Sequence, residues 1–401
     1  MRRRDLLVGG AAVFAASLAR AQTDALTQSQ FDDWVATMRG RALAEGVSSA
    51  AWDSGLQGLA PDPVVIARRA AAAETNQTVT DYVLKLLNGR GQKARAKYAA
   101  VPALSQIRDR FGVPGGPLVA LWGMESDYGA NIGDRDVLRA VATHGAAGSG
   151  GPEWGEEFIA ALKILQSNVV PRSRLIGSYA GAVGQTQLMP SNYIKFGVDF
   201  DGDGKIDVWG DSLDALATTA VHLTKACGWR AGESWLEEVN LPAALDWKAV
   251  EPETTALAPA AWDAMGVKRA SGAPWSDADK ASTAMLLLPA GLSAPAYLAF
   301  PNYSAFETYN PSVAYAVGVS LLAKFASGEP WLRKPWPAEP GLPLEQRMAA
   351  QEGLARLGYY DGKIDGFMGK QSRKALRDWQ LATGRPRDGH LTADQAKALA
   401  I

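Results

Sequence analysis

A short proline-rich segment divides the sequence into two parts that we expect to fold as separate units. Between Gly328 and Pro343 the chain contains five prolines, the others being Pro330, Pro335, Pro337 and Pro340. Proline lacks a backbone N–H and has a fixed φ, so it blocks both helix and sheet within such a run. We therefore predict a semi-rigid linker over residues 329–343. It separates a large domain at 25–328 from a small one at 344–401 and leaves them largely independent.

The composition excludes several classes of protein. The 41 basic and 42 acidic residues leave the net charge near zero, which removes the basic field that nucleic-acid binding requires. The single cysteine, Cys227, excludes an internal disulfide and a multi-cysteine zinc site. We interpret it as a buried, small apolar residue. With only three histidines, neither a paired-histidine zinc motif nor a convincing Cys/His pair is present, which disfavours a peptidase or amidase.

The first residues have the pattern of an export signal. Three arginines at 2–4 precede an apolar run from Leu6 to Leu18 and the small-residue pattern Ala19-Arg20-Ala21. We predict a signal peptide at 1–21 and a periplasmic protein, and an uncleaved anchor is the alternative. The run is shorter than the roughly 20 residues that cross a bilayer, so the mature chain should have no membrane span. No cysteine follows it, which excludes a lipoprotein, and both Sec and Tat export stay open.

Helical periodicity runs through most of the large domain, from Thr27 to about Gly328. Two short apolar runs, 284–289 and 296–300, flank a turn and suit a β-hairpin. The last segment shows three short helical patterns, and the final one begins with the capping box Thr392-Ala-Asp-Gln395. We therefore predict a mainly α protein with a small β-hairpin insertion and a three-helix C-terminal domain.

One carboxylate lies on an apolar helix stripe. With Pro117 as the first helical residue, Leu118, Leu121, Trp122 and Glu125 fall at i, i+3, i+4 and i+7. Desolvation and the helix C-terminus, closed by Gly129, both disfavour an anion and raise the pKa of Glu125. A general acid needs such a pKa near neutral pH. The alternative is a surface glutamate on a frayed last turn. Asp127 points to nearly the opposite side of the helix and is a poor second carboxylate.

Two sequence blocks carry a family resemblance. Trp122-Gly-Met-Glu-Ser-Asp-Tyr-Gly129 and Gly177-Ser-Tyr-Ala-Gly-Ala-Val-Gly-Gln-Thr-Gln-Leu-Met-Pro-Ser191 closely resemble the lytic murein transglycosylase B family. The likeness continues through Asp199–Gly204, Pro301–Tyr303 and Tyr309–Tyr315. It implies a lysozyme-like helical domain with a glycan groove, in which Glu125 is the catalytic acid and base.

The resemblance also implies roles for other residues of the site. Ser178 would hydrogen-bond the catalytic carboxylate or the acetamido group of the sugar, and Gln187 would line the groove. Tyr309 and Tyr315 would support the glutamate and stack on sugar, since tyrosine offers an apolar face and a polar hydroxyl. Asn310 and Met124 are further candidates. Each of these side chains also has a simpler interpretation as core packing.

An acidic loop resembles the start of a calcium site. Asp199-x-Asp201-x-Asp203-Gly204 matches the first half of an EF-hand loop, and the backbone carbonyl of Lys205 takes the seventh position. The twelfth position is Gly210 and not glutamate. Family members of the B type can have a longer loop, which Asp214, or alternatively Asp207, would close. A structural calcium ion and a solvated acidic turn are the two alternatives. We expect no cofactor for the chemistry itself.

The C-terminal segment resembles the three-helix peptidoglycan-binding domain of wall hydrolases, through the pattern Gln351-x-x-Leu-x-x-Leu-Gly-Tyr-Tyr-Asp-Gly-x-x-Asp-Gly-x-x-Gly369. The resemblance implies that its loop at 359–369 and the adjoining helix at 372–380 are the wall contact. The two resemblances together imply an enzyme that binds peptidoglycan glycan strands and cuts them with formation of 1,6-anhydromuramic acid ends. A muramidase that uses water and a non-catalytic wall-binding scaffold are the alternatives.

Overall fold

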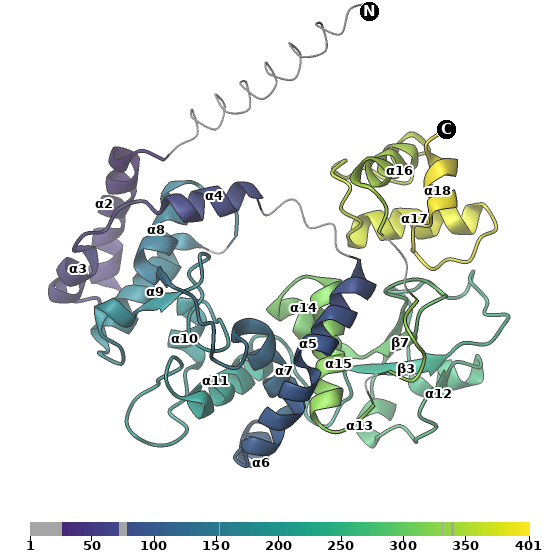
Figure 1. Ribbon diagram of the computed structural model, residues 1–401, viewed down its shortest axis with the longest axis horizontal. Helices are drawn as coiled ribbons and strands as arrows, with labels where there is room; N and C mark the ends of the chain where they lie inside the picture. Colours follow the sequence, from purple (N-terminus) through teal and green to yellow (C-terminus); the bar gives the residue numbers. More distant parts are fainter. Residues whose placement is uncertain (1–25, 72–77, 152, 331, 338–340) are drawn as a thin grey trace, which may run out of the picture. The chain divides into compact units, whose positions relative to one another are not determined.

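The computed structural model describes residues 26–71, 78–151, 153–330, 332–337 and 341–401 (Figure 1). The predicted signal peptide at 1–21 lies outside these residues. The chain forms two compact units, each built from two separate stretches of sequence: unit 1 comprises Met1–Glu74 and Gly129–Ala215, and unit 2 comprises Thr75–Tyr128 and Leu216–Ile401. Most of the described residues that have regular structure are helical, which confirms the predicted fold class. None of the described helices is long and apolar enough to span a bilayer.

Unit 1 is a helical bundle around an aromatic core. Its first helix begins at the capping box formed by Thr27 and Gln30, and Phe158 lies between Trp34 and Trp52 in edge contacts at the centre. A short antiparallel pair of strands, β1 with β2, adjoins the bundle. The elements of unit 1 are α2 (Gln28–Ala44), α3 (Ser49–Leu56), α4 (Pro63–Ala71), β1 (Arg135–Asp136), α8 (Val137–Ala146), α9 (Trp154–Gln166), η1 (Arg172–Arg174), β2 (Ile176–Gly177) and α10 (Pro190–Phe196).

Unit 2 contains a layer of closely packed helices in which α15 contacts both α5 and α7. Small residues permit this approach. A Cβ atom on Gly116 of α7 would lie 2.6 Å from the carbonyl oxygen of Ala323 in α15, and one on Gly318 of α15 would lie 2.8 Å from Leu86 of α5. The helices of this layer are α5 (Val79–Ala100), α6 (Leu104–Phe111), α7 (Gly115–Ser126), α14 (Pro301–Tyr309) and α15 (Val313–Ala326); α11 (Ser212–Lys225) runs from unit 1 into unit 2.

A five-stranded antiparallel sheet, with the order β4-β6-β7-β3-β5, completes the large part of unit 2. The predicted hairpin is present as β6 and β7, with Leu286 opposite Leu298. The prediction was wrong in extent, because the hairpin is the centre of a larger sheet. The sequence does not reveal its other strands, since two of them are only two residues long and β3 carries two adjacent glutamates. The remaining elements are β3 (Leu236–Asn240), β4 (Ala256–Leu257), α12 (Pro259–Ala264), β5 (Lys268–Arg269), α13 (Asp277–Lys280), β6 (Ala284–Leu287) and β7 (Ala296–Ala299).

The C-terminal segment folds into the three predicted helices, α16 (Leu344–Arg356), α17 (Lys370–Ala382) and α18 (Ala393–Leu399), around their own apolar core. The predicted capping box at Thr392 is present. The described residues of the proline-rich segment form neither helix nor strand. They are nevertheless held against the sheet: the backbone N–H groups of Arg333 and Lys334 donate to the Glu238 carboxylate, and Trp336 is buried beside Tyr297.

Buried ion pairs join the C-terminal domain to the turn that precedes β4. Arg373 of α17 donates to Glu253 at 2.6 Å, and Arg377, one turn further on, lies 3.3 Å from the same carboxylate. Arg387 pairs with Glu251 at 3.1 Å. These contacts contradict the expectation that the linker leaves the C-terminal domain largely independent. The prolines show only that the segment is irregular, whereas the docking depends on charged side chains that are far apart in the sequence.

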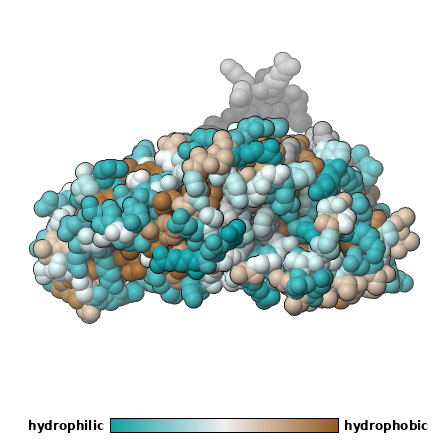
Figure 2. All heavy atoms as spheres, turned by 90° about the horizontal axis from the view of Figure 1, so that it is seen from below, coloured by the Kyte–Doolittle hydropathy of each residue, from teal (hydrophilic) through white to brown (hydrophobic). Residues whose placement is uncertain are grey.

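The surface is mixed in character. On the face in Figure 2, hydrophilic and hydrophobic residues are interspersed. Two of the large apolar side chains that are exposed belong to the C-terminal helical domain and lie in or next to its predicted wall contact: Leu357 and, with 65% of its surface exposed, Phe367.

Candidate active site

Glu125 is the penultimate residue of α7, a helix that is almost entirely inside unit 2. The helix begins at Gly115, two residues before the predicted start at Pro117. Its residues from Gly115 to Gly123 are all buried, so the predicted single apolar stripe is wrong: the helix is apolar on every side. The first partly exposed positions are Met124 and Glu125. The carboxylate therefore emerges where a wholly apolar helix reaches the surface.

A tight reversal of the chain follows Glu125. Asp127, Tyr128 and Gly129 all have positive φ, at 51°, 63° and 83°. The helix ends because Asp127, not Gly129, takes the left-handed capping position, and the N–H of Tyr128 donates to the carbonyl of Trp122. The Tyr128 ring then packs edge-on against the Trp122 ring, with the ring centroids 5.5 Å apart. The neighbours of Glu125 in the motif thus end the helix and fix its last turn.

Tyr315 contacts Glu125 directly. Its hydroxyl donates a short hydrogen bond to Oε1 of Glu125, across 190 positions of sequence. Tyr315 lies in the first turn of α15, where its own N–H donates to the side chain of Ser312, the N-cap. The cap and the close contact between α7 and α15 together set the position of the hydroxyl.

The surroundings of Glu125 raise its pKa from 4.5 to about 7. Burial is the largest cause, since it disfavours the charged form. The hydrogen bond from Tyr315 and the positive charge of Arg90 act in the opposite direction. A carboxyl group with this pKa is partly protonated near neutral pH, so it can give a proton and then take one back.

The other candidates in unit 2 surround this pair. Met124 lies 3.9 Å from Nη1 of Arg90, between the sulfur and the nitrogen. Tyr309 ends α14, and Asn310 is the C-cap of that helix. Burial raises the pKa of Tyr315 well above its ordinary value, and Glu125 and then Tyr309 add to this rise. The sequence analysis missed Arg90 and also Tyr82, whose pKa is raised by burial and then by Glu125. Both belong to α5, which contains no recognisable motif.

His222 and Cys227 form a pair that the sequence analysis did not expect. The Cys227 sulfur lies 3.8 Å from Nδ1 of His222, and the His222 ring contacts the ring of Tyr309 edge-on at 5.4 Å. Burial lowers the pKa of His222 to about 4 and raises that of Cys227 to about 12. Both groups are therefore neutral, and the pair lacks the thiolate that cysteine catalysis requires. Cys227 is buried, as predicted.

Ser178 and Gln187 belong to unit 1, where backbone contacts hold both. The Ser178 hydroxyl accepts from the N–H of Ala182, and Gln187 donates to the carbonyls of Ile132 and Gly184. The glycines of this block permit close contact of backbone with backbone: a Cβ on Gly177 would lie 2.1 Å from the carbonyl oxygen of Ala182. The block is thus a compact turn that presents Ser178 and Gln187, both partly exposed.

The acidic loop of unit 1 brings three carboxylates together. One oxygen each from Asp199, Asp201 and Asp203 lies within 4.8 Å of the others, and the loop folds back through backbone N–H donors to all three side chains. Three carboxylates supply part of the six to eight oxygens that Ca²⁺ takes, so the residues fit such an ion.

Asp214, the residue predicted to close the ion site, makes backbone hydrogen bonds to this loop. It is buried, and its two oxygens accept from the N–H groups of Phe200 and Asp207, at 2.7 and 2.8 Å. Asp207 in turn caps Trp209 and Gly210. Asp214 therefore closes the loop through the backbone.

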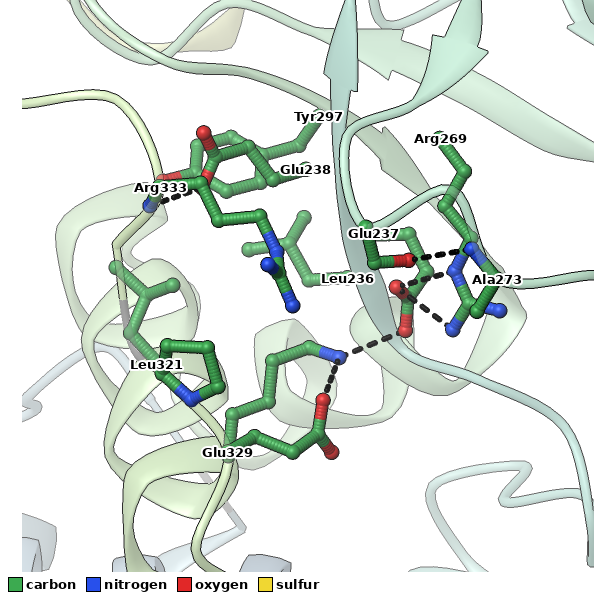
Figure 3. Close-up of a pocket in the computed structure, with 12 residues that line it drawn as sticks. Leu236, Glu237, Glu238, Arg269, Ala273, Tyr297, Leu321, Glu329 and Arg333 are labelled. Atoms are coloured by element: carbon green, nitrogen blue, oxygen red, sulfur yellow. Dashed lines mark hydrogen bonds and ion pairs between the residues drawn. The ribbon is translucent and has the colours of Figure 1, made fainter.

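Two cavities lie elsewhere in unit 2, and neither is lined by Glu125. Figure 3 shows the smaller one, of about 180 Å³, where Glu237 pairs with both Arg269 and Lys324. Lys324 also reaches Glu329. These charged side chains are paired with one another, so we interpret them as an ion-pair network with a structural role. The larger one, of about 300 Å³, lies between α17 and the sheet.

Comparison with known families assigns both parts of the chain. Residues 30–324 match the transglycosylase SLT domain, and residues 344–399 match a putative peptidoglycan-binding domain.

One relative with a solved structure covers nearly the whole chain, and two others cover less of it. SltB3 from Pseudomonas aeruginosa, in complex with NAG-NAM-pentapeptide, is 39% identical with a TM-score of 0.83, over 92% of this chain and 99% of that one. The membrane-bound lytic murein transglycosylase B of Escherichia coli (strain K12) is 35% identical over 135 residues, which is 33% of this chain and only 36% of that relative. The Escherichia coli transglycosylase Slt35 in complex with calcium is 24% identical, with a TM-score of 0.59 over 75% of this chain and 93% of that one, and so shows a shared fold.

Proposed function

Since the chain belongs to the transglycosylase SLT domain family and carries a putative peptidoglycan-binding domain, we propose that it is a lytic transglycosylase that cuts peptidoglycan. The bond cut is the β-1,4 link between N-acetylmuramic acid and N-acetylglucosamine. The observation that carries the proposal is the single carboxyl group of Glu125, whose pKa burial raises to about 7 and which Tyr315 holds in place.

One carboxyl group is enough for this reaction. Glu125 first donates its proton to the glycosidic oxygen, and the bond to the muramoyl C1 breaks. The resulting carboxylate then accepts the proton of the muramoyl 6-hydroxyl, whose oxygen attacks C1 and closes a 1,6-anhydro ring. The intramolecular hydroxyl replaces the water and the second carboxylate of ordinary glycosidases. Glu125 ends protonated, ready for the next cycle.

The remaining candidates have supporting roles in this proposal. Tyr315 orients the carboxyl group, while Tyr309, Asn310 and Met124 lie on the surface around it and contact sugar. Ser178 and Gln187 of unit 1 contribute hydrogen bonds to the acetamido group and the glycan. Asp199, Asp201 and Asp203, with the carbonyl of Lys205, hold a calcium ion that stabilises their loop and takes no part in the chemistry.

The proposed location is the periplasm, reached by cleavage of the signal peptide at 1–21. The C-terminal helices would then hold the enzyme on the wall, with Phe367 and its loop as the contact.

The test is product analysis with a Glu125→Gln variant. Glutamine keeps the size of the side chain but cannot give or take the proton, so turnover should fall about 100- to 10,000-fold while folding and glycan binding persist. The wild type should release fragments about 18 mass units lighter than hydrolysed ones, because no water is added. Reducing ends alone would identify a muramidase. Full activity of a folded Glu125→Gln protein would exclude Glu125 as the acid and base, and no cleavage by the wild type would leave a wall-binding scaffold.

A further inference from the structure

The cavity of about 300 Å³ between α17 and the sheet has an unusual combination of walls. One wall is apolar and consists of Met285, Leu287 and Ala299 from β6 and β7, with Val313 beside them. The other is basic: Lys370, Lys374 and Arg377 line it from successive turns of α17. A pocket that is basic on one side and aliphatic on the other suits a small amphipathic anion.

The acidic groups that line this cavity are fewer than its cations. Glu253 is already paired with Arg373 and Arg377, and Glu307 with Lys370 at 3.0 Å. Lys374 pairs with Asp378 on its own helix. The cavity is thus lined by three cations, Lys370, Lys374 and Arg377, and by two anions, Glu253 and Glu307. The N-terminus of α17, whose N-cap Gly369 has no side chain to accept a hydrogen bond, adds partial positive charge beside Lys370 and Gln371.

Two buried polar groups on the cavity wall lack a hydrogen-bond partner among the described residues. These are the hydroxyl of Tyr303 and Nε of Arg377, a side chain only 3% exposed whose Nη1 is paired with Glu253. Leaving such groups unsatisfied costs stability, so each calls for an explanation, and a bound ligand is one. A carboxylate can accept one hydrogen bond from a guanidinium N–H and another from a hydroxyl.

We propose that this cavity binds the terminal carboxylate of a peptidoglycan stem peptide, with Arg377 and Tyr303 holding the carboxylate and the apolar wall holding the methyl group of its last alanine. The inference rests on the proposed function for the identity of the ligand. In consequence, α17 and the sheet would together recognise the end of the peptide. The C-terminal domain would then complete a specificity site that is far along the chain from Glu125. The volume is at the lower end of the range for ligand pockets, which fits a peptide end and not a sugar chain.

The test uses full-length protein and N-acetyl-D-alanyl-D-alanine, a probe that has one carboxylate and no glycosidic bond. Calorimetric titration should show binding, about tenfold weaker or worse for the C-terminal amide of the probe and for Arg377→Gln. Tyr303→Phe should also weaken binding severalfold, and it removes a hydroxyl that has no internal partner, so the protein should fold normally. Tyr297→Phe, at a buried tyrosine of β7 that lines the smaller cavity, is the matched control and should bind as the wild type does.

Several results would overturn the inference: no binding of the probe, equal binding of acid and amide, acetate binding as tightly as the dipeptide, or a wild-type affinity in folded Tyr303→Phe. These outcomes are independent of the proposed reaction, because the probe cannot be cleaved. Protein that binds the dipeptide but never cuts glycan would refute the transglycosylase activity and leave the carboxylate site standing.

Discussion

The hydroxyl of Tyr315 donates a hydrogen bond to Oε1 of Glu125, which joins the first turn of α15 to the last turn of α7. The tyrosine lies on a helix that packs closely on the helix bearing the glutamate, and a serine cap fixes where its helix begins. The pair therefore works as one group: burial raises the pKa of the acid, and the phenol limits the rise and fixes the direction of the carboxyl group.

Tyr315→Phe should lower the cleavage rate about tenfold or more, since it removes a hydrogen bond to a charged group. It should also raise the pKa of Glu125, because that bond lowers it. The acid must be protonated to act, so activity is lost as pH rises through this pKa, and the alkaline limb of the pH profile should move upward. The measurement is kcat against pH. Tyr297→Phe serves as the control, and an unshifted alkaline limb in folded Tyr315→Phe would contradict the prediction.

Arg90→Gln should also move the alkaline limb of the pH profile to higher pH. Its positive charge lowers the pKa of Glu125, so its removal leaves burial less opposed. Arg90→Lys keeps the charge and should restore most of the wild-type pH profile. The residue also contacts Met124, so a fall in rate alone would not separate charge from packing. The position of the alkaline limb separates the two effects. Equal positions in Arg90→Gln and Arg90→Lys would refute the electrostatic role of Arg90.

Calcium should raise the melting temperature of the wild type, because an ion that binds only the folded loop stabilises it. The double variant Asp201→Ala, Asp203→Ala should lose this response. Asp214→Asn is the informative comparison. It should lower the stability by about 1–3 kcal/mol with or without calcium, since the carboxylate accepts two backbone N–H groups. If Asp214→Asn instead abolishes the calcium response and leaves the ion-free protein unchanged, Asp214 is a ligand and our interpretation of the loop is wrong.

Glu253→Gln should destabilise unit 2 by about 3–5 kcal/mol, because it leaves Arg373 and Arg377 buried without their shared carboxylate. The same pair predicts acid sensitivity. Burial would raise the pKa of Glu253, but the two arginines outweigh it and hold the pKa below its ordinary value of 4.5. The stabilisation is thus complete above pH 4.5 and is lost as pH falls through the lower folded pKa. Melting temperatures measured from pH 7 to pH 3 would show this loss of stability. Parallel plots of melting temperature against pH for the wild type and Glu253→Gln would contradict the prediction.

Phe367→Ser should weaken adsorption to insoluble wall sacculi and leave the fold intact, since the ring is mostly exposed. Ile194→Ser is a matched control, because Ile194 is also an exposed apolar side chain but belongs to unit 1. Point variants are preferable to removal of 329–401, which would also remove the buried ion pairs that Arg373 and Arg377 make with Glu253. Equal adsorption of the Phe367 and Ile194 variants would show that the loop at 359–369 is not the wall contact.

The sequence by itself determined the local features of this protein. The capping box at Thr392, the three C-terminal helices, the β6–β7 hairpin and the burial of Cys227 follow from patterns a few residues long. The raised pKa of Glu125 was also predictable, because an apolar helix leads directly to that residue. Such features depend on backbone geometry and burial over one or two turns, which neighbouring residues specify.

The tertiary structure alone decided which distant side chains meet. Tyr315 reaches Glu125 across 190 positions, and Arg90 acts on it from a helix without any motif. The remaining strands of the sheet and the docking of α17 through Arg373 on Glu253 were likewise absent from local patterns. The physical reason is that these contacts arise when separately formed surfaces pack. The free energy of such a contact depends on both residues. Neither segment of the chain therefore has a periodic sequence pattern that predicts the contact.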